Sequence, residues 1–142
     1  MSELPEKLQE IVDDFALLEG NEKLEYLMEL AEELPPLPER LAADRDQMEQ
    51  VHECMTTVFV SAGKGDDDRL TFHIDAPPES PTVRGYATIL TRGLSGLTLD
   101  EVMAVPTEFY LKMGLQQVLS GQRLTGIGGI LAHMKRVTAE SR

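Results

Sequence analysis

The sequence predicts an α+β protein: two N-terminal helices, a small antiparallel sheet of about three strands, and then C-terminal helices. Apolar residues recur at helical spacing before position 35 and again after position 82. Between these regions, Leu70, Phe72 and Ile74 alternate with polar residues, which is typical of a half-buried strand. Because the expected strands are grouped and do not alternate with helices, the pattern indicates α+β and not a parallel α/β sheet.

Two helices are expected in the first 34 residues. The first is expected over residues 4–18, with Gly20 as the residue that ends it. Asn21 is expected to cap the second helix, which Pro35 and Pro36 stop because proline cannot donate a backbone hydrogen bond. The expected apolar faces are Leu8, Ile11, Val12, Phe15 and Leu18, and then Leu24, Leu27, Met28, Ala31 and Leu34.

A long connection and a hairpin are expected next. Residues 35–50 are proline-rich and then charged, with a short helical turn expected over residues 46–52; connections of this length are often functional. Strand-forming Thr, Val and Phe fill residues 55–60, residues 63–68 are expected to turn, and residues 70–75 form the second strand. An isolated hairpin is marginal in water, so helices or a third strand must cover one face.

The remaining chain is expected to be helical. One helix is expected over residues 83–94, and Thr98 with Glu101 forms a capping box for a short helix that continues through Ala104. Residues 107–119 are expected to form another helix, with Phe109, Leu111, Leu115 and Val118 in the core. Three glycines are expected to open the last helix: Gly126, Gly128 and Gly129.

Length and charge limit the classes of protein. The 142 residues correspond to one domain, residues 1–142. Gly, Pro or charge interrupts every apolar run, and the N-terminus is acidic, so we expect a cytoplasmic protein without a membrane partner. The net charge of −12 falls entirely in residues 1–53, which hold sixteen acidic and four basic residues. This charge argues against a nucleic-acid partner. It is consistent with solvated helix faces or with a surface that steers toward a basic partner.

The single cysteine, Cys54, is the first candidate for chemistry. One cysteine excludes an intramolecular disulfide, a CxxC redox pair and a multi-thiolate metal or cluster site. Cys54 is therefore either a buried apolar residue or a reactive thiol, and a reactive thiol needs a lowered pKa because the thiolate is the nucleophile. On an extended backbone His52 would share a face with Cys54, whereas Glu53 would lie on the other face.

Other chemistries have weaker support. His52, His73 and His133 lack the close spacing of metal ligands, so no metal site is expected. No serine has the G-x-S-x-G context of a hydrolase, and residues 126–129 do not match a phosphate-binding loop. The N–H groups of residues 126–129 could alternatively favour a nearby thiolate if they open a helix.

Four stretches in order resemble the SufE/CsdE family of sulfur acceptors. They are a helix followed by Leu34-Pro35, the cysteine segment of residues 51–60, the helix start Val83-Arg84-Gly85, and residues 115–126 with Arg123 near the final helix. Together they span nearly the whole chain. The family usually has Gly before the cysteine, where this chain has Glu53. A carboxylate close to a thiol raises the pKa of that thiol.

The resemblance implies a function for Cys54 and an α+β fold shared with IscU-type scaffolds. Cys54 would accept persulfide sulfur from a SufS-type cysteine desulfurase, stimulate that enzyme, and pass sulfur on for iron–sulfur cluster assembly, with a cluster scaffold as a downstream partner. Arg123 matches a basic residue near the family's cysteine, and His52 is the second supporting residue. The protein would be a carrier and not an enzyme, with no cofactor or metal of its own, because PLP belongs to the desulfurase. The alternative is a docking regulator with an inert, buried Cys54.

Overall fold

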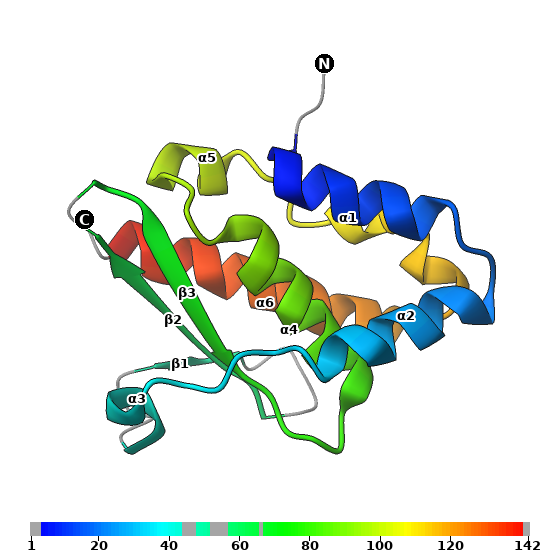
Figure 1. The fold of residues 1–142 in the computed structure, drawn as a ribbon, viewed down its shortest axis with the longest axis horizontal. Helices are drawn as coiled ribbons and strands as arrows, with labels where there is room; N and C mark the ends of the chain where they lie inside the picture. The colour runs from blue at the N-terminus through cyan, green and yellow to red at the C-terminus, as the bar shows by residue number, and fades with distance from the viewer. Residues whose placement is uncertain (1–3, 44–47, 52–56, 66, 141–142) are drawn as a thin grey trace.

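The computed structural model describes residues 4–43, 48–51, 57–65 and 67–140. Figure 1 shows helices around a small sheet, which confirms the predicted α+β class. The α-helices are α1 (Glu6–Ala16), α2 (Asn21–Ala31), α3 (Glu39–Ala43), α4 (Pro81–Leu94), α5 (Leu99–Met103) and α6 (Gly121–Glu140). The strands are β1 (Glu49–Gln50), β2 (Phe59–Lys64) and β3 (Leu70–Asp75), and two 3₁₀ helices are η2 (Phe109–Met113) and η3 (Leu115–Gln117). No helix in the described part of the chain is long and apolar enough to cross a membrane.

The sheet has three antiparallel strands in the order β1-β2-β3. β1 pairs Glu49 with Val60 and Gln50 with Phe59, so the third strand lies inside the stretch that the sequence predicts as a connection. The helical turn expected over residues 46–52 is wrong, because residues 49 and 50 are in this strand; the short helix α3 comes earlier.

The first strand of the predicted hairpin is displaced along the chain. It begins at Phe59, not at residue 55, and continues to Lys64, which pairs with Leu70. The turn is correspondingly shorter, and Gly65 N–H donates to the Arg69 carbonyl at 2.9 Å. Ser61, Ala62 and Gly63 are weak strand formers alone, but pairing with β3 supplies their backbone partners.

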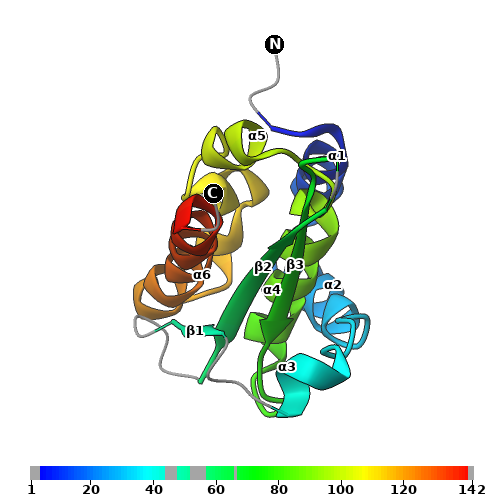
Figure 2. The same ribbon diagram turned by 90° about the vertical axis from the view of Figure 1, so that its left-hand side faces the viewer.

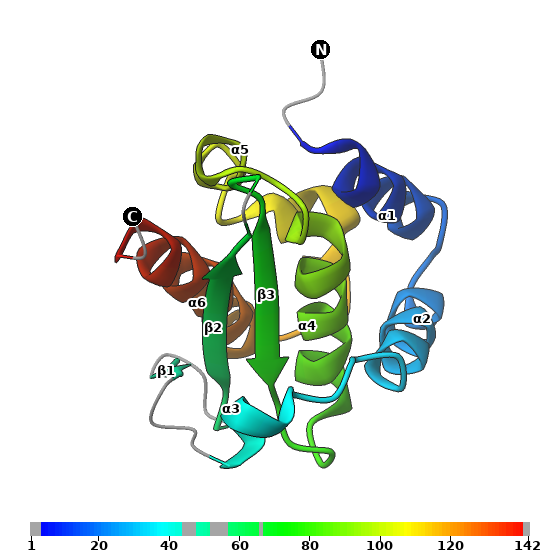
Figure 3. The same ribbon diagram turned by 60° about the vertical axis from the view of Figure 1, so that its left-hand side comes forward.

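The hydrophobic core lies between one face of the sheet and the helices α4 and α6. In β3, Leu70, Phe72 and Ile74 are buried while Thr71 is exposed, as the alternation predicts. Figure 3 shows α4 beside β3 and α6 on the side of β2, with α1 and α2 beyond α4. Figure 2 shows α6 on one side of the sheet strands and α2 on the other. The starts of α4 and α6 lie close together, because Arg123 of α6 donates a hydrogen bond to Thr82 of α4.

Helices α2 and α4 approach closely at a glycine. A Cβ atom at Gly85 would lie 2.0 Å from the backbone oxygen of Leu27, so only glycine fits there. Near this point, Thr88 Oγ1 donates to the Leu30 carbonyl at 2.7 Å. The predicted apolar face of this helix is confirmed, because Val83, Ala87, Leu90 and Leu94 are all buried.

The predicted face of the second helix is partly wrong. Leu27 and Ala31 are buried, but Met28 is 45% exposed and Lys23 is only 3% exposed. Lys23 Nζ donates to the carbonyls of Phe15 and Met113, at 2.5 and 3.0 Å. The ammonium group of Lys23 therefore links the end of α1 to η2. Its two hydrogen bonds offset part of the free-energy cost of removing the charge from water.

The predicted helix over residues 107–119 is instead two short 3₁₀ helices separated by Gly114, whose φ of +76° is left-handed. Leu111 is 46% exposed, contrary to its expected place in the core. The capping box is confirmed: Thr98 N–H donates to Glu101 Oε1 at 2.9 Å, and this bond holds the pKa of the Glu101 carboxyl below its ordinary value.

The last helix begins at Gly121, five residues before the three glycines expected to open it. Residues 126–129 therefore lie inside α6, where backbone N–H groups bond to the preceding turn. The suggestion that these groups serve an anion is wrong. Ile127, Ile130, Leu131 and Met134 are buried, as expected.

Candidate functional site

The candidate acceptor lies in the connection between β1 and β2. Cys54, His52 and Glu53 lie outside the described residues, but both ends of the connection are described. Val51 N–H donates to the Val58 carbonyl at 2.8 Å, and the two side chains are 1% and 0% exposed. The sequence predicts Cys54 where a connection meets the first strand of a hairpin; the described strands that precede and follow this part of the chain are β1 and β2. The described residues on either side of the connection, Val51 and Val58, are therefore hydrogen-bonded to each other and buried.

The start of α4 lies at the same end of the sheet. Phe59, the first residue of β2, pairs with Asp75, the last residue of β3. Val58, just before β2, and Ala76, just after β3, therefore lie at the same end of the sheet. The Ala76 carbonyl accepts a hydrogen bond from Arg84 Nη1 at 2.6 Å, and Arg84 is in the first turns of α4. This bond holds the beginning of α4 against the sheet end from which the cysteine-bearing connection departs.

Arg123 lies at the start of α6 and is exposed. Its Nη1 donates to Thr82 Oγ1 at 2.9 Å, and Thr82 is the second residue of α4. The Arg123 backbone N–H donates to Ser120 Oγ at 3.3 Å, which anchors the first turn of α6. This chain of contacts brings Arg123 to the same end of the fold as Val51, Val58 and Ala76. The two supporting residues differ in outcome: the structure places Arg123, whereas His52 is outside its described part.

A second set of contacts holds β1 to α6. Glu49 of β1 is hydrogen-bonded through Oε2 to Nδ1 of His133, and its Oε1 lies 3.5 Å from Nε of Arg136. The side chain of His133 is 11% exposed and that of Glu49 is 21% exposed. We call these three residues the β1 clasp. Sequence reasoning missed the clasp, because Glu49 and His133 are 84 residues apart and neither lies in a motif.

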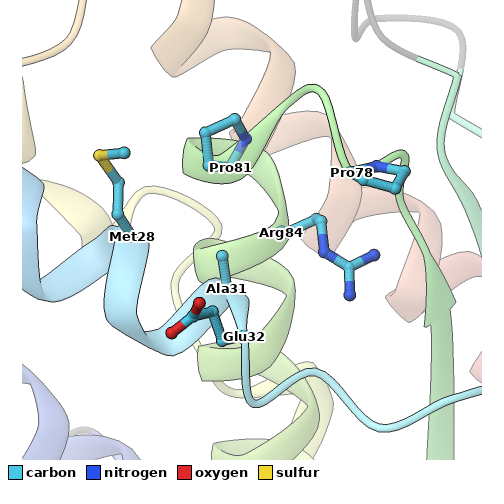
Figure 4. A pocket seen from close by; sticks show the side chains of 6 residues that line it. All are labelled: Met28, Ala31, Glu32, Pro78, Pro81 and Arg84. Atoms are coloured by element: carbon cyan, nitrogen blue, oxygen red, sulfur yellow. The ribbon is translucent and has the colours of Figure 1, made fainter.

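A hollow of about 390 Å³ lies beside the start of α4. Figure 4 shows Met28 and Ala31 of α2 on one side of it, with Glu32 directly after that helix; Pro81 and Arg84 come from α4 and Pro78 from the loop before it. Arg84 extends toward the side of β3. The hollow is open and its lining is mixed, so it forms part of the surface beside the candidate site and not an enclosed substrate cavity.

The two described histidines have separate environments. His133 belongs to the β1 clasp, whereas His73 lies on β3, where burial and the charge of Arg40 lower the pKa of its imidazole. Among the described residues, no group of three or more His, Cys, Asp and Glu side chains is arranged to hold a metal ion.

The fold and the site together define a class: a small α+β protein that carries one cysteine between its first two strands, with an arginine at the start of its last helix. A family model described as "SufE: Fe-S metabolism associated domain" matches residues 9–138. The chain belongs to the SufE family, and the resemblance found in the sequence is confirmed.

Several relatives extend this finding. The chain is 42% identical over 138 residues to a SufE-like protein of Mycobacterium tuberculosis, covering 97% of this chain and 95% of the relative. It is 32% identical to SufE-like protein 1, chloroplastic/mitochondrial, of Arabidopsis thaliana, covering 96% of this chain and 36% of that longer protein. The sulfur acceptor protein CsdE of Escherichia coli is 27% identical over 115 residues, covering 80% of this chain and 75% of CsdE.

A solved structure has the same fold. The solution structure of a hypothetical protein from Thermus thermophilus superimposes with a TM-score of 0.84 and 30% identity, covering 97% of both chains. The likeness extends over nearly the full length, so the element order described above is that of a known fold.

Proposed function

We propose that this chain accepts persulfide sulfur on Cys54 from a SufS-type cysteine desulfurase and passes that sulfur on for iron–sulfur cluster assembly. Membership in the SufE family carries the proposal. A relative named as a sulfur acceptor, CsdE, supports the acceptor role. The single cysteine supports a relay in place of a cluster scaffold, since holding a cluster takes several thiolates.

The transfer is a thiol–persulfide exchange. The Cys54 thiolate attacks the outer sulfur of a persulfide on the desulfurase cysteine, and a new S–S bond forms between Cys54 Sγ and that sulfur. The old S–S bond breaks, and the desulfurase cysteine leaves as a thiolate. One S–S bond replaces another, so no external oxidant or reductant is required. Removing the persulfide frees the desulfurase for another turnover, which accounts for the stimulation that we propose.

Arg123 is proposed to favour the thiolate of Cys54. The contact of Arg123 with Thr82 supports this role, because it holds the guanidinium at the end of the fold where the β1–β2 connection begins and ends. A guanidinium has five N–H donors, and the contact with Thr82 engages one of them. A positive charge near a thiol lowers its pKa, whereas the carboxylate of Glu53, next in sequence, acts in the opposite direction. His52 is proposed to assist as a second polar neighbour.

The protein itself is proposed to be a carrier, a single domain over residues 1–142, working in the cytoplasm with no cofactor or metal of its own. PLP belongs to the partner desulfurase, where it activates the cysteine substrate. The sulfur is proposed to go next to a cluster scaffold.

Intact-protein mass after incubation with a SufS-type desulfurase, PLP and cysteine tests the proposal. The sample is alkylated, with a reductant-treated control and Cys54→Ser in parallel. We expect added mass of one or more sulfur atoms that is lost on reduction and is absent from Cys54→Ser. No added sulfur beside a desulfurase shown to be active would contradict the proposal. If Cys54→Ser still stimulated the desulfurase, the docking-regulator function would replace it.

A further inference from the structure

A second hollow, of about 410 Å³, lies between α1 and α2. Residues from the end of α1, from the turn after it and from α2 line this hollow, and we call it the α1–α2 hollow. Figures 1 and 3 show this turn on the opposite side of α4 from β2, the strand that follows Cys54 in the sequence. The α1–α2 hollow therefore lies on a different face of the molecule from β2.

Apolar and aromatic side chains supply part of the lining: Leu17, Leu18 and Tyr26. Leu17 follows the last residue of α1 and is 83% exposed, the largest exposure of any large apolar side chain in the described part of the chain. The ring of Tyr26 packs against the buried ring of Phe15, with centroids 4.8 Å apart, so the core holds it in place. One exposed leucine is ordinary on a protein surface. An exposed leucine beside a hollow and an anchored aromatic ring is a place where a partner can bury apolar area.

Four exposed carboxylates share the lining with these side chains: Asp14, Glu22, Glu25 and Glu29. Among the described residues that line the hollow, none is Lys or Arg. The backbone N–H of Glu19 donates to Glu22 Oε1 at 3.1 Å, and this donor carries no net charge. The apolar part of the hollow is therefore surrounded by negative charge that the lining itself does not neutralise.

The phenol of Tyr26 lies in the field of this charge. Burial raises the pKa of the phenol, and the nearby carboxylate of Asp14 raises it further. Glu29 and Glu33 add to the rise, whereas Arg92, which is paired with Glu33, opposes it. The electrostatic potential at the hollow is thus negative, which attracts a cation and repels an anion.

This potential selects among the possible occupants. Nucleic acid and anionic lipid surfaces are both negatively charged and would be repelled. Two copies of this chain joined through the same face would bring like carboxylates together, which is unfavourable. A basic protein segment gains electrostatic attraction, and it gains apolar burial as well if it carries an apolar side chain between its cations.

We propose that the α1–α2 hollow docks a basic segment of a partner protein, in which Lys or Arg side chains flank an apolar one. The apolar side chain contacts Leu17 and Tyr26, and the basic side chains face the surrounding carboxylates. This docking goes beyond the sulfur-acceptor function and does not depend on it, because no residue of the hollow takes part in sulfur transfer.

The probe for the test is an alanine-based helical peptide whose single leucine is flanked by lysines one turn before and after it. A second peptide has serine in place of the leucine. Fluorescence anisotropy of the labelled peptides with the full chain, at physiological ionic strength, measures affinity. Amide chemical shifts of isotope-labelled protein show where the leucine peptide binds, and we expect the largest changes in residues 14–29.

Glu25→Lys/Glu29→Lys tests the charge of the hollow. It is expected to weaken binding of the leucine peptide by about tenfold, since each reversal removes an exposed attraction and adds a repulsion. Its matched control is Glu6→Lys/Glu10→Lys on α1, which makes the same change in net charge at two exposed positions, also four residues apart, outside the hollow. The control is expected to bind within about twofold of the wild type, because exposed charges far from the peptide are screened by salt.

Leu17→Ser tests the apolar contact. It is expected to weaken binding of the leucine peptide by about fivefold and to leave the serine peptide unchanged, because part of a leucine side chain is buried in one case only. Met103→Ser on α5, where the methionine is 46% exposed, is the matched control and is expected to bind both peptides as the wild type does.

Four results would overturn the proposal. The first is that the leucine peptide does not bind, and the second is that it shifts amides outside the hollow. The third is equal weakening in Glu25→Lys/Glu29→Lys and its matched control, which would show attraction by net charge alone. The fourth is a wild-type dimer in sedimentation that Leu17→Ser converts to a monomer, which would identify a second copy as the occupant. Urea unfolding confirms that each variant is folded, as expected for changes at exposed positions.

Discussion

Gly85→Ala tests the close approach of α2 and α4. The new Cβ atom would lie 2.0 Å from the Leu27 oxygen and 2.9 Å from the Leu27 carbonyl carbon, whereas real Cβ contacts are essentially never shorter than 3.0 Å. The obstructing atoms belong to the backbone and cannot rotate away, so the two helices must separate by about 1 Å.

Two opposing effects set the magnitude. Alanine favours a helix over glycine by about 1 kcal/mol. Overpacking a core contact costs about 1–3 kcal/mol and occasionally more, and separation of the helices also strains the hydrogen bond from Thr88 to Leu30, a further cost of about 1 kcal/mol. Because the clash is with backbone, we expect the upper part of this range and a net loss of about 2–3 kcal/mol in the free energy of unfolding.

Urea unfolding and thermal melting measure this change, with Gly128→Ala in α6 as the matched control. A Cβ atom at Gly128 would lie 3.4 Å from Tyr110 Cε2, an ordinary contact, so that variant is expected to gain up to about 1 kcal/mol from helix propensity. Both variants change glycine to alanine inside a helix and differ in the contact alone. Equal stability of the two would refute the argument that Leu27 obstructs a side chain at position 85.

Two further variants test the site and a buried charge. Arg123→Gln removes the guanidinium that we propose favours the thiolate, so the pKa of the Cys54 thiol is expected to rise and the midpoint of its alkylation to move to higher pH; an unchanged midpoint would exclude Arg123 from activation. Lys23→Met removes the hydrogen bonds to the carbonyls of Phe15 and Met113 and is expected to cost about 2 kcal/mol in urea unfolding. A Lys23→Met protein as stable as the wild type would mean that desolvating the ammonium costs as much as its hydrogen bonds contribute.

Periodic segments were predicted well because one face of each is buried. The alternation of Leu70, Phe72 and Ile74 gave β3 with its buried face, and the apolar spacing from Val83 to Leu94 gave α4. The capping box of Thr98 and Glu101 was also predicted, since it depends on residues three positions apart. In these segments the local pattern and the tertiary fold agree.

Elements whose partners are distant in sequence were predicted poorly. β2 includes Gly63 and Lys64, which are not strand formers and are held by pairing with Thr71 and Leu70. Lys23 interrupts the apolar pattern of α2 and yet is buried, because the carbonyls that accept its hydrogen bonds come from α1 and η2. Gly114, inside the predicted helix over residues 107–119, adopts a left-handed conformation and divides that helix in two.

The sequence by itself determined the α+β class, the family and the identity of the candidate acceptor, because a single cysteine and the order of segments are visible without a structure. Only the tertiary structure decided that the described strands before and after this cysteine in the sequence pair with each other, that Arg123 contacts Thr82, and that Glu49 is held by α6. The physical reason is the range of the interactions. Periodicity and capping depend on neighbours within a few positions, whereas the contacts at the candidate site join residues 41 and 84 positions apart, which come together only when the core packs.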